Sequence, residues 1–134
     1  MDQFNEPNEP NELEQAILAV RAGALSQQEF VAKLVGSRIA VPSRTEVLGE
    51  LGAVRPILLD KGNETFVAAY TEVVYADAFR NLASYCLQIN ALAWLRAMPR
   101  DVGLVLNPGM DATIQFSAPG VQQIVRNFSP EPIN

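Results

Sequence analysis

The segment Gly103–Gly109 reads GLVLNPG, and Ala112–Phe116 after it reads ATIQF. The run Leu104–Leu106 is wholly apolar, which is typical of a strand that helices cover on both faces. Asn-Pro-Gly then favours a tight turn, because proline presets one backbone angle and glycine adopts positive φ. Thr113–Phe116 resumes an extended pattern. The segment therefore predicts a central buried strand, a turn and a second strand.

Two short helices are predicted before any strand. Asn11 is a suitable N-cap with Glu14 three residues later to complete a capping box, and an apolar helical stripe follows to near Gly23. Ser26 and Glu29 form a second capping box, before a helix that stops at Gly36.

Three further helices are predicted in the second half of the chain. Thr71 is expected to cap a helix over residues 72–79, and Asn90 to cap one over residues 91–98 that Pro99 ends. Pro119 begins a last helix, in which apolar residues recur at helical spacing as far as Phe128.

The remaining strands flank a hairpin turn, Lys61-Gly62-Asn63, whose Gly-Asn pair suits positive φ. They are expected at Arg38–Val41, closed by Pro42, at Pro56–Asp60, at Thr65–Tyr70 and at Tyr85–Ile89. The predicted fold is a single α/β (α+β) domain. It has a mixed sheet of about five to six strands with helices packed on it, and two helices at the N-terminus.

The chain divides into a flexible acidic arm at residues 1–11, a domain at residues 12–128 and a tail at residues 129–134. Charge sets the arm apart, and proline content sets the tail apart. Five of the fifteen acids lie within residues 1–14, which hold no base, so the other ten balance the ten bases. The arm repeats Asn-Glu-Pro, which favours an extended, solvated segment, or alternatively a docking strip for a basic partner. A neutral body argues against nucleic-acid binding, because phosphates demand a basic face.

The cellular location is predicted from two kinds of segment that the sequence lacks. It has no run of about 18 apolar residues and no basic, then apolar, leader, so we expect a cytoplasmic protein without a membrane partner. Cys86 is the one cysteine and cannot form an internal disulfide. Its neighbours Tyr85 and Leu87 predict that it packs as a small hydrophobe.

The order of these motifs resembles the N-terminal domain of the bacterial SseB family, named for enhanced serine sensitivity, over roughly residues 12–128. The residues that carry the resemblance are Leu13-Glu14, Glu29-Phe30, Val41-Pro42, Tyr70-Thr71-Glu72 and Leu106-Asn107-Pro108-Gly109, with Val121 and Ile124 after them. Tyr70 stands where members often carry Phe. The resemblance implies this fold and a protein of unsettled molecular function, linked in some members to amino-acid sensitivity or secretion systems.

The sequence contains few of the residue types and motifs that catalysis commonly uses. The chain has no histidine, which excludes classical triads and histidine-bound zinc. The acids Asp60, Asp77, Asp101 and Asp111 are expected to be solvated turn formers. Gly49-Glu50-Leu51-Gly52 is too short and acidic for a phosphate loop. We therefore expect no catalytic residue, no metal and no cofactor.

These exclusions leave a non-catalytic protein-interaction module as the leading function, with a protein partner. The candidate interaction surface is at strand ends, where α/β sheets present their sites: Tyr70, Thr71, Glu72, Asn107, Pro108 and Gly109. The alternative is a small-molecule or amino-acid sensing domain, which a pocket lined by Tyr70 and Thr71 would favour.

Overall fold

The computed structural model describes residues 11–46 and 54–128. The predicted arm up to residue 10, the Gly49–Gly52 segment and the tail at residues 129–134 lie outside the described residues. The helices are α1 (Glu12–Arg21), α2 (Gln27–Val35), α3 (Val73–Ala76), α4 (Ala91–Ala97) and α5 (Ala118–Phe128), with a 3-10 turn η2 (Asp77–Phe79) after α3. The strands are β1 (Arg38–Ser43), β2 (Leu58–Lys61), β3 (Glu64–Ala69), β4 (Tyr85–Asn90), β5 (Gly103–Leu106) and β6 (Ile114–Phe116).

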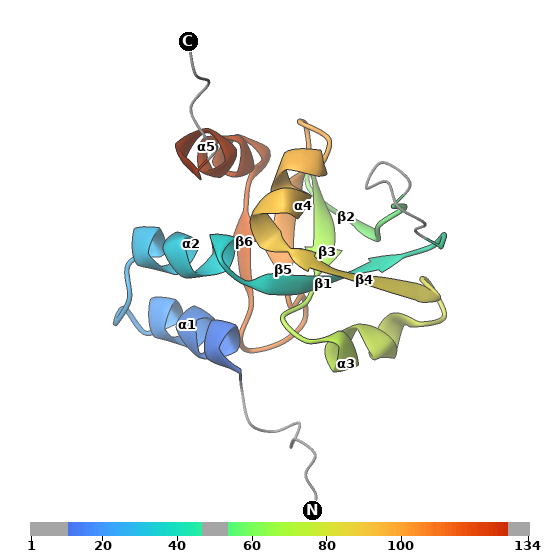
Figure 1. Ribbon diagram of the computed structural model, residues 1–134, viewed down its shortest axis with the longest axis horizontal. Helices are drawn as coiled ribbons and strands as arrows, with labels where there is room; N and C mark the ends of the chain where they lie inside the picture. The colour runs from blue at the N-terminus through green and yellow to red at the C-terminus, as the bar shows by residue number, and fades with distance from the viewer. Residues whose placement is uncertain (1–10, 47–53, 129–134) are drawn as a thin grey trace, which may run out of the picture.

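The six described strands form two sheets (Figure 1). One has the order β2-β3-β5-β6, in which β3 and β5 are parallel and the other pairs antiparallel. The other is the antiparallel pair β1-β4. Two isolated bridges link β1 to residues next to the larger sheet: Ala40 pairs with Tyr70, just after β3, and Ser43 pairs with Pro56, just before β2. The mixed α/β class, the strand number and the two N-terminal helices are confirmed.

The division into two sheets has a local cause. On the side of β3 that faces β1, β2 and Ile57 already pair with the strand as far as Ala68, whose N–H donates to the Ile57 carbonyl. Only Tyr70 is left to exchange hydrogen bonds with Ala40, and the chain then leaves the strand direction toward α3. The two sheets are therefore linked by isolated bridges rather than by a continuous ladder.

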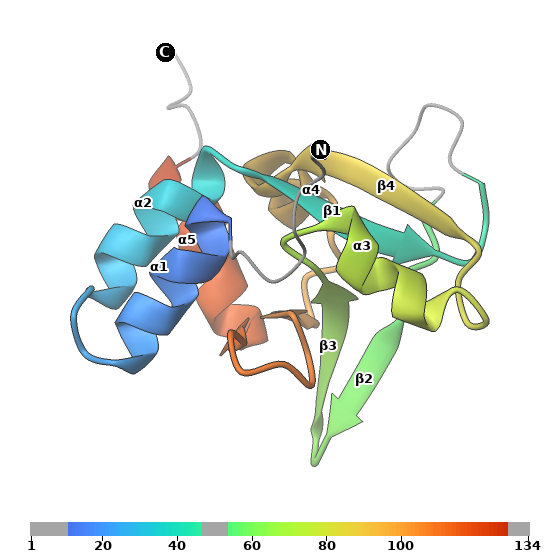
Figure 2. The same ribbon diagram turned by 90° about the horizontal axis from the view of Figure 1, so that it is seen from below.

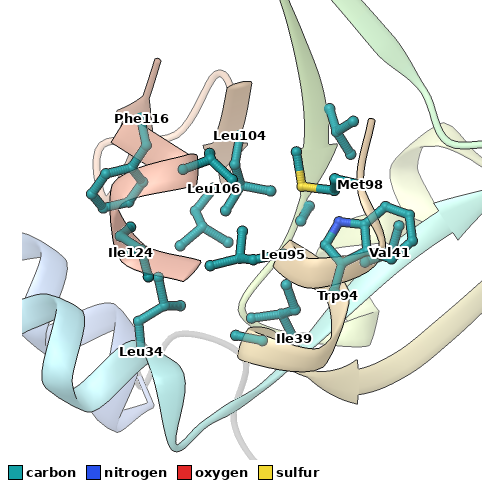
Figure 3. Packing of buried hydrophobic residues seen from close by; sticks show 14 of the residues in the cluster. Leu34, Ile39, Val41, Trp94, Leu95, Met98, Leu104, Leu106, Phe116 and Ile124 are labelled. Carbon is teal, nitrogen blue, oxygen red and sulfur yellow. The ribbon is translucent and has the colours of Figure 1, made fainter. Parts of the chain in front are cut away.

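The main core lies between the sheets and the helices α1, α2, α4 and α5 (Figure 3). All four residues of β5 are buried, as a central strand requires. Leu104 and Leu106 meet Leu95 of α4 and Ile124 of α5 in this core. A smaller core forms on the other side, where α3 packs against β1 (Figure 2).

Gly103 explains why β5 begins with glycine. A Cβ at this position would lie 2.8 Å from Cδ2 of Phe66 and would overlap the carbonyl oxygen of Phe116. The ring of Phe66, on the neighbouring strand, therefore packs directly over the glycine backbone. The close approach of β3, β5 and β6 depends on the missing side chain.

Two expectations about β1 and β4 are wrong. The first strand continues through Pro42 to Ser43 instead of ending at Val41. Ala40 bonds away from β4, toward Tyr70, and Pro42 two residues later has the same orientation, so the ladder with β4 needs no N–H from the proline. Cys86 is exposed, because the alternation of side chains along β4 turns Leu87 and Ile89 toward the main core and Cys86 toward the opposite face. No described helix is long and apolar enough to cross a membrane.

Candidate functional site

Asn107 begins the Asn-Pro-Gly turn that follows β5, and it is fully buried at 0% exposure. Its φ of 56° lies in the left-handed region, which asparagine tolerates better than most residues. The side-chain Oδ1 accepts from the N–H of Thr71 at 3.0 Å. Nδ2 donates to Oγ1 of Thr71 and to the carbonyl of Ala112, each at 3.0 Å. The side chain thus ties the end of β5 to the end of β3.

Thr71 has a different role from the predicted one. The N-cap of α3 is Glu72, which makes no side-chain capping bond, and α3 is a single turn continued by η2. The hydroxyl of Thr71, on a residue only 6% exposed, is bonded to Asn107 instead. The cap prediction failed because the partner of this hydroxyl is 36 residues away in the sequence and invisible to local pattern.

The same junction holds the first helix. Asn11 caps α1 as predicted, since its Oδ1 accepts from the N–H of Glu14 at 2.7 Å. Its Nδ2 donates to the carbonyl of Thr71 at 3.0 Å and to Oε2 of Glu72 at 2.6 Å. One side chain therefore satisfies the helix terminus and also anchors it to the end of β3.

Glu14 faces α3 rather than completing the predicted capping box. Its Oε1 accepts from the hydroxyl of Tyr75 at 2.7 Å. Burial, and then this hydrogen bond, raise the pKa of Tyr75 to about 12. Burial alone raises the pKa of Tyr70 to about 12 as well. Both phenols are therefore neutral near neutral pH and serve this junction as uncharged groups.

The six predicted surface residues are brought together, but they divide by burial. Tyr70, Thr71 and Asn107 are buried and bonded inside the protein. Glu72 and Pro108 are half-buried and Gly109 is exposed. The buried residues hold the turn in place, and Pro108 and Gly109 are the residues that reach a surface hollow.

That hollow, here called the β5–β6 groove, has a volume of about 510 Å³. The floor includes Val105 and the half-buried Leu59, which lie on the face opposite the main core. Ile114, which packs partly against that core, also lines the groove. The described residues that line it are Arg21, Leu59, Lys61, Val105, Pro108, Gly109, Thr113, Ile114 and Gln115. They come from α1, β2, β5, β6 and the turn between β5 and β6.

Two cations flank the groove. The guanidinium of Arg21 at the end of α1 reaches the Thr113 carbonyl at 3.4 Å, a long and weak contact. The ammonium of Lys61 donates to Oε1 of Gln115 at 2.8 Å and lies 6.0 Å from the ring centre of Phe66. None of the described residues that line the groove is acidic. The groove therefore combines an apolar floor with a positive rim.

Sequence reasoning missed both cations as site residues. Lys61 was recognised as part of the hairpin turn, which it is, with Gly62 at a φ of 65°. Arg21 ends a helix 92 residues before its Thr113 contact, so no local signal connects the two. Arg21 reaches the groove through its contact with the Thr113 carbonyl, just before β6.

A second hollow of about 470 Å³ lies between α2 and α5. Its apolar floor includes Phe116 and Ile124, and the polar residues around it are the amides of Gln27, Gln28, Gln123 and Asn127. It contains no charged group among its described lining residues. Neither hollow includes a pair of acids.

The four acids weighed for catalysis are exposed. Asp60 accepts from the hydroxyl of Thr65 at 2.8 Å, and Asp77 pairs with Arg80 at 3.0 Å, three residues along the chain. Within residues 11–46 and 54–128, no group of three or more acid or cysteine side chains is arranged to hold a metal.

The model of the family described as SseB protein N-terminal domain matches residues 13–123, most of the chain. No curated protein and no solved structure matches the chain significantly. The matched range contains Asn107, its partners Thr71 and Ala112 and all residues that line the β5–β6 groove, whereas Asn11 lies just before it.

Proposed function

The chain belongs to the SseB protein N-terminal domain family, and we propose that it is a non-catalytic protein-interaction module whose β5–β6 groove binds an extended, acidic segment of a partner protein. The observation that carries the proposal is the lining of the groove, in which Arg21 and Lys61 flank an apolar floor without an acid. A complementary segment would place apolar side chains on the floor and carboxylates at the rim.

The floor would supply most of the binding free energy. Its volume of about 510 Å³ falls in the range of roughly 300–1,000 Å³ that is typical of ligand sites. Val105 is already buried, so the apolar area that a partner would cover lies on Leu59 and Ile114, and it contributes about 25 cal/mol for each Å² removed from water. Arg21 is exposed, and an exposed ion pair contributes only about 0.2–1 kcal/mol. The rim cations would therefore set preference for acidic partners rather than overall affinity.

Amino-acid sensing, the alternative function, has less support at the predicted position. A sensor needs polar groups that are available to a ligand's ammonium and carboxylate. Thr71 and Asn107 have their side chains bonded to each other, and both are buried. Opening this pair to a ligand would leave buried groups unsatisfied.

The proposal is tested with a fluorescent peptide in which glutamates alternate with leucine and phenylalanine, beside a second peptide with glutamines in place of the glutamates. Binding is followed by fluorescence anisotropy at low and high salt. We expect the acidic peptide to bind more tightly than the neutral one, and the difference to shrink as salt screens the rim.

Charge-removing variants identify the groove. Arg21→Gln and Lys61→Gln should each weaken the acidic peptide by about 1.5- to 5-fold, the equivalent of an exposed ion pair. Lys33→Gln, on an exposed cation of α2, is the matched control and should leave affinity unchanged. Equal affinity of the two peptides, or equal effects of all three variants, would show that the groove is not the acidic-segment site.

A further inference from the structure

The outer edge of β4 carries backbone N–H and C=O groups that no described strand pairs. Ala40 uses its N–H and C=O to bond Tyr70 on the side away from β4. Its cross-strand partner Gln88 therefore belongs to a pair without hydrogen bonds to β1, and the N–H and C=O of Gln88 point outward. The same alternation turns the backbone groups of Cys86 outward, opposite Pro42.

The strand β4 itself carries none of the features that usually protect an edge against pairing, although Arg38 of β1 reaches its Gln88 carbonyl. Natural edge strands are short, charged or interrupted by proline. The outer strand β6 has only three residues, and β2 has four that include Asp60 and Lys61. By contrast, β4 spans six residues, YCLQIN, with no charge and no proline. Figure 2 shows β4 along the rim of the two-stranded sheet, with β1 on one side of it.

We propose that β4 pairs antiparallel with β4 of a second copy of this chain, in a register centred on Leu87. In that register Cys86 lies opposite Gln88 of the partner subunit, and each such pair exchanges two N–H···O bonds. The twofold axis generates a second, equivalent pair, in which Gln88 lies opposite Cys86 of the partner subunit. The outward N–H and C=O groups of both residues are then hydrogen-bonded between the two strands. The result is a four-stranded sheet with the order β1-β4-β4-β1 across two subunits.

The side chains fit this occupant. Leu87 meets Leu87 of the partner subunit across the dyad, and Tyr85 lies opposite Ile89 of the partner subunit, an aromatic pairing with a β-branched residue that stabilises sheets. Tyr85 is 44% exposed in the single chain, so this contact would cover apolar surface. The paired β4 residues carry no charge of their own, so no like charges stand directly opposite each other in the ladder. Arg38 of β1 brings a cation near the edge, where it is bonded to the Gln88 carbonyl.

One side chain already contacts this edge. Nη2 of Arg38 donates to the carbonyl of Gln88 at 3.2 Å. A carbonyl oxygen has a second lone pair, so this contact is compatible with the intersubunit bond. The dimer edge lies on β4 and shares no lining residue with the β5–β6 groove, so dimerisation and groove binding are independent properties.

Sedimentation velocity on the full chain, over a range of concentrations, tests the proposal. We expect the mass to rise toward two chains as concentration increases. Amide hydrogen exchange at high concentration should slow at Cys86 and Gln88 relative to dilute protein. Gln88→Pro removes the outward N–H and leaves the β1 ladder intact, so it should fold and remain monomeric. Gln88→Thr keeps the N–H and should still dimerise.

Two results would overturn the proposal. A chain that stays monomeric at every concentration, with fast exchange at Cys86 and Gln88, does not use this edge for self-pairing. A dimer that Gln88→Pro leaves unchanged is formed through another face. Circular dichroism of Gln88→Pro establishes that the variant is folded. Gln88→Val also keeps the N–H and serves, beside Gln88→Thr, as a second control that should still dimerise.

Discussion

Replacing Asn107 by alanine should strongly destabilise the protein while leaving most of its surface unchanged. The substitution removes the acceptor of the Thr71 N–H and the donor to the Ala112 carbonyl, both at 3.0 Å. Each buried backbone group left without a partner costs about 1–3 kcal/mol. Alanine at a φ of 56° adds about 1 kcal/mol of backbone strain.

Together these effects predict a loss of about 3–5 kcal/mol in the free energy of unfolding, because water that enters the vacated space recovers part of the lost bonds. That is a large share of the roughly 5–15 kcal/mol that holds a typical domain together. Urea unfolding measures it, with the fluorescence of Trp94 as the probe, since this residue is the one tryptophan and is buried.

Two matched variants separate the causes. Asn107→Gly loses the same hydrogen bonds without the positive-φ strain, so it should be about 1 kcal/mol more stable than Asn107→Ala. Thr71→Val keeps the side-chain shape and the bonded N–H, and should cost only about 1–2 kcal/mol. If Asn107→Ala lay within about 1 kcal/mol of the parent protein, or if Gly and Ala were equivalent, the reasoning about this junction would be refuted.

Three further outcomes follow from the packing and the titration of buried groups. Gly103→Ala should cost about 3 kcal/mol or more in urea unfolding because its methyl would overlap Phe66 and the Phe116 carbonyl, whereas Gly120→Ala, whose methyl would lie 3.3 Å from the exposed Ser117 hydroxyl, should cost much less. The indole N–H of Trp94 is buried and has no hydrogen-bond partner among the described residues. Trp94→Phe should therefore lower the free energy of unfolding, followed by circular dichroism, by only about 1 kcal/mol, and a loss above about 3 kcal/mol would indicate that the indole N–H does make a hydrogen bond. The raised pKa of Tyr75 means that its neutral phenol stabilises the fold in full below pH 10, and that this contribution is lost as pH rises toward about 12; Tyr75→Phe should therefore lose less stability over that interval, and an identical alkaline profile would count against the assignment.

Local features were predictable because their causes lie within a few residues. Asn11, Ser26 and Asn90 cap their helices as expected, each accepting from a backbone N–H three residues later. Gly62 occupies the hairpin turn with positive φ. The apolar run before Asn107 forms a fully buried strand between β3 and β6. Hydrophobic period and turn chemistry are short-range properties, so a single sequence reveals them.

Features that depend on distant partners were not predictable. The hydroxyl of Thr71 was expected to cap α3 and is bonded to Asn107 instead. Cys86 was expected to be buried and is exposed. An apolar run such as Tyr85-Cys86-Leu87 does not show which of its alternating side chains will face the core. Pro42 was expected to end β1, but its place in the ladder depends on which way Ala40 bonds. Each error concerns the choice between partners, not the type of element.

The sequence by itself determined the α/β class, the helix starts, the buried strand and the turn that carries Asn107, because side-chain pattern and backbone preference act locally. Tertiary structure alone decided that Asn107 would be satisfied by Thr71, that Arg21 and Lys61 would flank one groove, and that β4 would keep an open edge. These outcomes arise when the helices and strands pack, since only packing selects the partner for each polar group and leaves some surfaces uncovered.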